Sequence, residues 1–192
     1  MNRRDAVSRV ALLLGATVIG ADFFLSGCKL SNKDEKKGAS LSFTKDDIAY
    51  LDEIAETIIP TTDTPGAKAA KTGEFMTVMV KDAYDEKNQK AFLEGMTKID
   101  EASEKKFKSG YMKISAEQRT ELLKEIDAEM KEYMKSKKKD DAPHYFTLMK
   151  QLTMLGYFTS EIGMTKALRY DPVPGKFDGN YPYKKGDRAF AG

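Results

Sequence analysis

The sequence predicts an all-α fold, in which a single bundle of about five helices is followed by an extended C-terminal segment rich in proline and glycine. From Thr44 onward, apolar residues recur every three to four positions, the spacing of one face of a helix. Segments with two-residue alternation and β-branched residues are missing, so no strand is expected. At 192 residues, the chain is long enough for one domain with a substantial core.

The first predicted helix begins after Thr44, a good N-cap residue, and ends at Pro60. Its apolar face is expected to consist of Ile48, Leu51, Ile54, Ala55, Ile58 and Ile59. Residues 60–73 are rich in turn-forming residues and predict an irregular loop. A second helix is predicted over about residues 74–84.

Two longer helices follow. The first is predicted over residues 88–108, where apolar residues again recur at helical spacing. The second begins after Ser115, because Gln118 stands three residues later in the position of a capping box. The charged segment 136–141 is expected to end it.

The fifth predicted helix has Pro143 at its first position and reaches about Phe158. Apolar side chains cover most of its circumference, so it is either a central buried helix or one that a partner covers. The only histidine, His144, stands at its start, where a capping or surface role is favoured over that of a catalytic base.

The C-terminal segment begins with a short predicted helix that Thr159 or Ser160 caps and that ends near Tyr170. Three residues then impose an extended and tightly turned course: Pro172, Pro174 and Gly175. Such a segment cannot form a core of its own. We therefore expect it to lie on a surface, either of this domain or of another protein.

Residues 1–27 resemble a bacterial signal peptide, with a basic start, an apolar run and a cleavage region of small residues. The adjacent Arg3 and Arg4 are similar to a twin-arginine signal, whose route exports folded proteins. The tetrad LSGC, which ends at Cys28, resembles a lipobox, in which the cysteine becomes lipidated. An ordinary Sec signal with a chance cysteine is the alternative.

The lipoprotein interpretation divides the chain into three parts: the signal peptide over residues 1–27, a lipidated Cys28 with a flexible tether over residues 28–43, and a helical domain over residues 44–192. The apolar run over residues 10–21 is shorter than the ~20 residues that a transmembrane helix needs. The protein is therefore expected to be exported, as a lipoprotein that faces the periplasm or sits in the outer membrane.

Composition excludes several classes of function. The 32 basic and 30 acidic residues nearly cancel, so nucleic acid is not an expected partner. One cysteine and one histidine give no zinc motif, and no metal site is expected. The chain lacks a GxGxxG motif after a strand, so we expect no dinucleotide cofactor and assign no catalytic residue.

Two blocks of sequence resemble the gluconate 2-dehydrogenase subunit 3 family, the small subunits of membrane-associated flavin-dependent sugar dehydrogenases. The first block, residues 58–67, reads IIPTTDTPGA. The second comprises GYFTSEIG at 156–163, LRYDPVPG at 168–175 and FDG at 177–179. Some members carry a cysteine directly after the last element, where this chain has Asn180, so its tail must be held by packing and hydrogen bonds.

The resemblance implies a non-catalytic subunit that binds a large FAD-containing dehydrogenase of the glucose-methanol-choline type. The FAD would belong to that partner, this chain would bind no cofactor, and a haem protein is one candidate electron acceptor. The small subunit would carry the export signal for the pair. A stand-alone helical envelope lipoprotein that binds a ligand or another protein is the alternative.

The predicted partner-binding residues come from the fifth helix and the segment after it: Tyr157, Phe158, Glu161, Arg169, Tyr170, Pro172, Pro174, Gly175 and Phe177. Glu161 and Arg169 are two helical turns apart, so they could share one helix face. A structural salt bridge between them and a role in docking remain equal alternatives.

Overall fold

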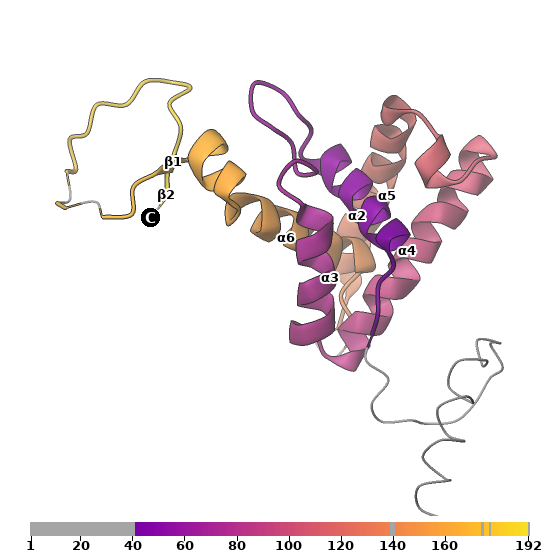
Figure 1. Cartoon of the computed structure of the whole chain (residues 1–192). Coiled ribbons are helices and arrows are strands. Elements are labelled where there is room, and N and C mark those ends of the chain that lie inside the picture. Colours follow the sequence, from indigo (N-terminus) through magenta and orange to yellow (C-terminus); the bar gives the residue numbers. More distant parts are fainter. Residues whose placement is uncertain (1–40, 139–140, 174, 177, 192) are drawn as a thin grey trace, which may run out of the picture. The chain divides into compact units, whose positions relative to one another are not determined.

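The computed structural model describes residues 41–138, 141–173, 175–176 and 178–191. Within them lie five α-helices, which Figure 1 shows: α2 (Lys45–Ile58), α3 (Thr72–Ala83), α4 (Glu86–Phe107), α5 (Ala116–Ser136) and α6 (Tyr145–Phe158). A 3-10 turn, η1 (Tyr111–Lys113), precedes α5, and a π-helical turn, η2 (Gly163–Ala167), follows α6. The predicted all-α class is confirmed.

Local capping signals explain where two of the helices begin. The Thr44 side chain accepts a hydrogen bond from the Asp47 N–H, and the Asp47 carboxylate accepts one from the Thr44 N–H. Ser115 and Gln118 form the same reciprocal capping box at the start of α5. Both N-caps were predicted from the sequence, and both are confirmed.

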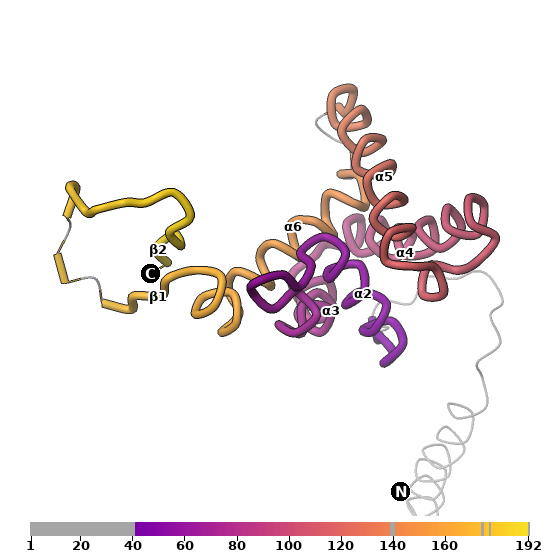
Figure 2. Tube along the Cα trace, turned by 90° about the horizontal axis from the view of Figure 1, so that it is seen from above, coloured from indigo at the N-terminus to yellow at the C-terminus, as the bar shows by residue number. Residues whose placement is uncertain are grey.

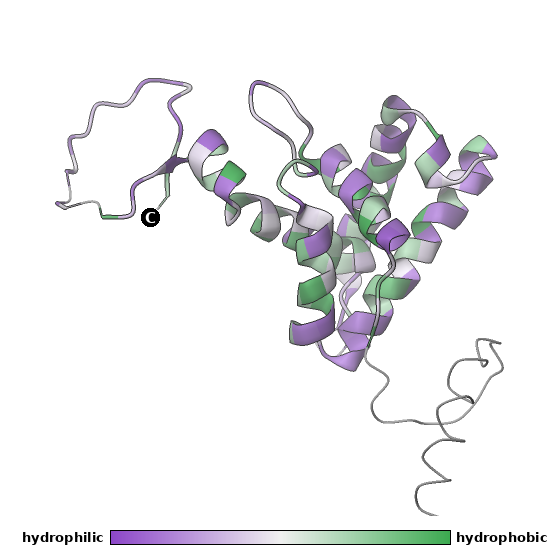
Figure 3. Cartoon of the chain, in the orientation of Figure 1, coloured by the Kyte–Doolittle hydropathy of each residue, from purple (hydrophilic) through white to green (hydrophobic). Residues whose placement is uncertain are grey.

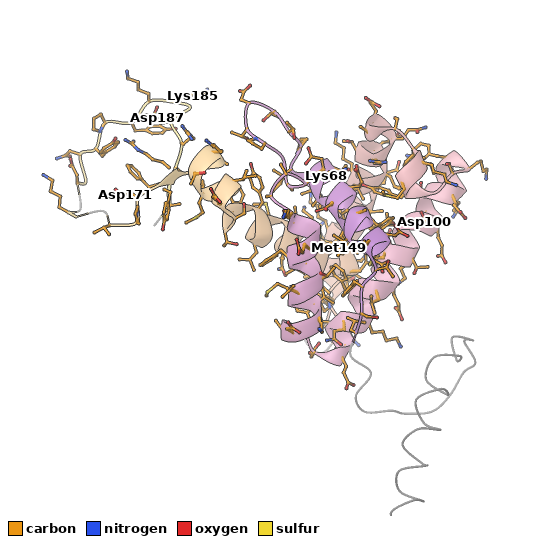
Figure 4. The ribbon with its side chains drawn as sticks, in the orientation of Figure 1. Lys68, Asp100, Met149, Asp171, Lys185 and Asp187 are labelled. Carbon is orange, nitrogen blue, oxygen red and sulfur yellow. The ribbon has the colours of Figure 1, made fainter. Side chains whose placement is uncertain are left out.

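Helix α6 lies at the centre of the bundle and packs against α2, α3, α4 and α5. Figure 2 shows it running between these helices, and Figure 4 shows Met149 in their midst. Its buried residues are Tyr145, Phe146, Leu148, Met149, Leu152, Thr153, Gly156 and Tyr157. The structure therefore agrees with the first alternative for this helix, a central buried position, although the side chains of Met154 and Leu155 are exposed.

The start of α6 differs from the prediction by two residues. His144 is the N-cap, and its Nδ1 accepts a hydrogen bond from the Phe146 N–H at 3.2 Å. Pro143 therefore precedes the cap, whereas the sequence predicts it at the first helical position. His144 itself has the predicted capping role, and its ring is buried.

The end of the helical region also differs. The predicted short helix is present, and the Ser160 hydroxyl oxygen accepts from the Gly163 N–H at 3.0 Å, as the predicted cap would. It ends at Ala167 and not near Tyr170, as the π turn η2, closed by the Leu168 N–H donating to the Gly163 carbonyl at 2.8 Å. Arg169 and Tyr170 form a two-residue strand, β1 (Arg169–Tyr170), parallel to β2 (Phe190–Ala191). The expectation of no strand is therefore wrong at this one place, because the chain end returns to pair with this segment.

Residues 1–40 lie outside the described part of the chain, and with them Arg3, Arg4, Cys28 and most of the tether. Among the described helices, none combines the length and the hydropathy that crossing a membrane requires. Figure 3 shows apolar and polar residues alternating along the helices. The buried residues of α2, α4 and α5 recur at helical spacing and give each of these helices one apolar side.

Candidate partner interface

The two blocks that carry the family resemblance come together at the C-terminal end of α6. The Tyr157 side chain is only 2% exposed, and its hydroxyl donates a hydrogen bond to the Pro65 carbonyl at 2.7 Å. This bond joins α6 to the loop between α2 and α3, across 92 residues of sequence. We call residues 60–71 the α2–α3 loop.

A glutamate on α2 organises this loop. The Glu56 carboxylate accepts hydrogen bonds from the Thr61 N–H at 2.9 Å, the Thr61 hydroxyl at 2.8 Å and the Lys68 N–H at 2.9 Å. The Thr61 hydroxyl oxygen in turn accepts from the Gly66 N–H at 3.0 Å. One carboxylate therefore binds both ends of the loop, which makes it an ordered surface despite its irregular backbone.

Two neighbouring acids on α2 complete the arrangement. The Asp52 carboxylate accepts from the Gly73 N–H at 2.7 Å, at the start of α3. Glu53 forms ion pairs with Lys68 of the loop, labelled in Figure 4, and with Arg119 of α5. Glu53 and Glu56 thus fix the loop to α2, and Asp52 fixes the start of α3 directly after it.

The environments of these two acids shift their pKa values in opposite directions. Burial raises the pKa of Asp52, and this effect exceeds the opposing hydrogen bond from Gly73. Burial also acts to raise the pKa of Glu53, but the hydrogen bond from Lys68 and the charge of Arg119 lower it overall. Glu53 is therefore held ionised, whereas the charge on Asp52 is disfavoured.

A glycine permits the close approach of α3 and α6 below the loop. A Cβ added at Gly156 would lie 2.6 Å from the Phe75 Cδ1 and 3.2 Å from the Thr72 Cγ2. Thr72 is itself buried and donates its hydroxyl proton to the Ala67 carbonyl at 2.8 Å. Helix packing and loop position are therefore coupled at this point.

The predicted interface residues of α6 have different roles in the structure. Tyr157 is buried and bonded to Pro65, so its side chain acts inside the chain and supports the loop. Phe158 is half-buried and packs against the core. The apolar side chains that α6 exposes are Met154, at 48%, and Leu155, at 45%.

The remaining predicted residues lie beyond α6. Those that are exposed in the described part of the chain are Glu161, Arg169, Tyr170, Pro172 and Gly175. Pro174 and Phe177 lie outside the described residues. The salt bridge between Glu161 and Arg169 is not among the ion pairs of the described residues, because the helix ends before Arg169. The Arg169 guanidinium lies instead over the rings of Tyr181 and Phe190, 5.2 Å and 4.7 Å from their centroids.

The sequence analysis did not identify the three carboxylates of α2 that hold the loop and the start of α3, which are Asp52, Glu53 and Glu56. Their one sequence signal is that they stand together on the polar side of a helix, directly before a segment rich in turns. A surface charge pattern has the same appearance, so the signal is weak.

The described residues contain no cluster of side chains that could form a metal site. No three of their His, Cys, Asp or Glu side chains lie close enough together to hold a metal ion.

A groove of about 570 Å³ lies between α4, α5 and the start of α6, beside Tyr133, His144 and Tyr145. Burial lowers the pKa of His144, and its Nδ1 is already used for the helix cap.

Comparison with known proteins gives one match. Residues 45–175 match the model of a family described as gluconate 2-dehydrogenase subunit 3. Neither the curated proteins nor the solved structures gave a match. The matched range covers all five described α-helices, the α2–α3 loop and the first residues of the segment after β1.

Proposed function

The chain belongs to the gluconate 2-dehydrogenase subunit 3 family, and we propose that it is the non-catalytic small subunit of a flavin-dependent sugar dehydrogenase. Its partner would be a large subunit of the glucose-methanol-choline type, which holds the FAD and oxidises a sugar, a sugar acid or a glycoside. The family match over residues 45–175 is the observation that carries this proposal.

The geometry at the end of α6 supports a docking role. A surface that is already ordered loses less conformational entropy on binding than one that must first fold. The α2–α3 loop meets this condition, because Glu56 and Tyr157 hold it from two sides. On the same helix as Tyr157, Met154 and Leu155 expose apolar surface that a partner could bury.

We extend the proposal to export. A flavoprotein binds FAD in the cytoplasm as it folds, so it must cross the membrane folded. The Arg3–Arg4 pair resembles a twin-arginine signal, whose route carries folded proteins. A large subunit without a leader of its own could therefore cross while bound to this chain. Lipidation at Cys28 would then hold the complex at the membrane, facing the periplasm.

In this account the chain takes no part in electron transfer. The large subunit would oxidise the substrate at its flavin and pass the electrons to a separate acceptor, for which a haem protein is one candidate. The role of this chain is to bind, to guide export and to anchor.

Export of the pair is the test. Replacing both Arg3 and Arg4 by lysine should keep this chain and the flavoprotein in the cytoplasm, because the twin-arginine pathway requires the arginine pair. Arg9→Lys is the matched control and should leave export unchanged, since it alters the same basic region outside the pair. Flavin-containing protein is measured in the cytoplasmic and envelope fractions. Normal export of the flavoprotein with the double variant would contradict the proposal.

A further inference from the structure

The groove at the start of α6 lies apart from the proposed docking surface. Its volume of about 570 Å³ is in the range of sites that bind small molecules, about 300–1,000 Å³. Tyr145, which lines the groove, and Tyr157 stand at opposite ends of α6, about 18 Å apart along the helix axis at 1.5 Å per residue. The proposed function therefore makes no use of this groove.

His144 carries a hydrogen-bond donor that the fold does not use. Its Nδ1 accepts from the Phe146 N–H at 3.2 Å, so the neutral ring carries its proton on Nε2. Burial lowers the pKa of His144, which favours this neutral form. The residue is only 8% exposed, and none of the hydrogen bonds among the described residues involves its Nε2.

This nitrogen is accessible from the groove, whose lining includes His144. In the described chain, the fully enclosed side-chain polar atoms without a partner are Asn88 Oδ1 and Thr147 Oγ1, and the His144 Nε2 is not one of them. Since Nε2 has neither a partner nor full enclosure, it opens onto the groove that the ring lines. A ligand in the groove that presents an acceptor would satisfy this donor.

Tyr133 forms a fixed aromatic surface beside the donor. Its ring centroid lies 5.6 Å from that of His144, and its hydroxyl donates to the Ala142 carbonyl at 2.9 Å. Tyr133 is 38% exposed, so its ring is accessible although its hydroxyl is anchored. An aromatic side chain that is already held in place loses little conformational entropy when a ligand stacks on it.

The charges at the mouth of the groove nearly balance. Three carboxylates and two ammonium groups line it, all on exposed residues: Glu94, Glu101, Glu129, Lys98 and Lys105. Of these five, Glu94 alone forms an ion pair with another described residue. The mouth therefore offers free donors and free acceptors together, and a charged ligand would meet like charges as well as opposite ones.

An uncharged sugar fits this combination of groups. Each sugar hydroxyl both donates and accepts hydrogen bonds, so neighbouring hydroxyls can pair with carboxylates and with ammonium groups. The C–H groups on one face of a pyranose ring lie favourably on the electron-rich face of an aromatic ring. We propose that this groove binds an uncharged sugar, which accepts a hydrogen bond from the His144 Nε2–H and stacks on the Tyr133 ring. The inference goes beyond the proposed function, which gives this chain no ligand of its own.

The single histidine of the chain makes the site directly observable. In the ¹⁵N-labelled full chain without a histidine tag, the imidazole signals come from His144 alone, and D-glucose is added at constant pH and ionic strength. We expect the Nε2 signal to shift saturably, with half-saturation at about 1–10 mM. Sodium acetate and tetramethylammonium chloride test for an anion site and a cation site, and both should leave the signal in place.

Variants locate the sugar within the groove. Tyr133→Ala removes the stacking surface and should raise the half-saturating glucose concentration about tenfold. Tyr183→Ala is the matched control: it removes a tyrosine that is 73% exposed outside the groove, and it should bind as the wild type does. His144→Asn keeps a residue suited to an N-cap but loses the Nε2–H donor. Its glucose binding, followed by saturation transfer to the sugar protons, should also weaken about tenfold.

Three results would overturn the inference. The first is an Nε2 signal that glucose leaves unmoved up to about 100 mM. The second is an equal shift with acetate or tetramethylammonium, which would make the groove a site for ions. The third is unchanged glucose binding in Tyr133→Ala or His144→Asn, which would place the sugar elsewhere. None of these measurements involves the flavoprotein, so the proposed function stands or falls separately.

Discussion

Tyr157→Phe tests whether the C-terminal end of α6 holds the α2–α3 loop. The substitution removes one hydroxyl and keeps the ring in the core. In the wild type, this hydroxyl donates to the Pro65 carbonyl at 2.7 Å, and the tyrosine is 2% exposed. The variant therefore loses a part-buried hydrogen bond, while the aromatic ring keeps its packing.

The expected loss of stability follows from the burial of this bond. A hydrogen bond within a protein contributes about 0.5–1.5 kcal/mol net, and a polar group left buried without its partner costs about 1–3 kcal/mol. Partial access of water to the loop reduces the second contribution, so we expect Tyr157→Phe to cost about 1–2 kcal/mol in the free energy of unfolding. For a domain of this size, the melting temperature should fall by about 2–8 °C.

Tyr133→Phe is the matched control. Its hydroxyl also donates to a backbone carbonyl, that of Ala142 at 2.9 Å, but the side chain is 38% exposed. Water can replace the lost partner there, so the change should stay within about 0.5 kcal/mol. Urea unfolding of the two variants and the wild type gives the comparison, with equal slopes expected for all three. Equal losses in both variants, or no loss in either, would refute the reasoning.

Four further predictions concern the supports of the loop, the packing of α3 against α6 and the anchor. Asp52→Asn should leave stability at pH 7 unchanged or slightly raised, because burial raises the pKa of Asp52 and an amide oxygen can still accept the Gly73 N–H. Glu53→Gln should cost about 1–2 kcal/mol at pH 7 through its two ion pairs. The folded state lowers the pKa of Glu53, so this contribution is present above the pKa of the unfolded state and is lost as the pH falls through the pKa of the folded state. Urea unfolding at pH 7 and at a series of decreasing pH values should therefore show the stability of Glu53→Gln converging with that of the wild type. Gly156→Ala should cost about 1–3 kcal/mol despite the better helix propensity of alanine, because the new Cβ would overlap the Phe75 ring; a melting temperature at or above that of the wild type would contradict this. Cys28→Ala should leave folding intact and release the protein from membranes on fractionation, whereas unchanged membrane association would rule out the lipid anchor.

The features predicted correctly are those that neighbouring residues determine. The N-caps Thr44 and Ser115 bind amides three residues away, so their role can be recognised in a short window of sequence. The helical periodicity of the core depends in the same way on local spacing. For α6, the nearly continuous apolar surface left two alternatives, a buried helix or an interface, and the packing against α2, α3, α4 and α5 decides for the first.

The features that were missed depend on where the chain returns in space. The hydrogen bond from the Tyr157 hydroxyl to the Pro65 carbonyl joins residues far apart in sequence, so no local sequence pattern predicts it. Arg169 was expected at a helix end, but it pairs with the returning chain end at Phe190. The difference at the start of α6 is smaller: proline favours the first position of a helix, but the His144 side chain caps the helix, which therefore begins at Tyr145.

The central claim is that this chain binds a flavoprotein, and affinity isolation from native membranes tests it most directly. The tagged chain is recovered after mild solubilisation, and the eluate is examined for flavin absorbance and for sugar oxidation with an artificial electron acceptor. We predict a large flavin-containing subunit in stoichiometric amount, with sugar-oxidising activity that this chain alone lacks. A flavin-free chain, recovered as a stable monomer without a partner, would contradict the account and favour a stand-alone helical lipoprotein.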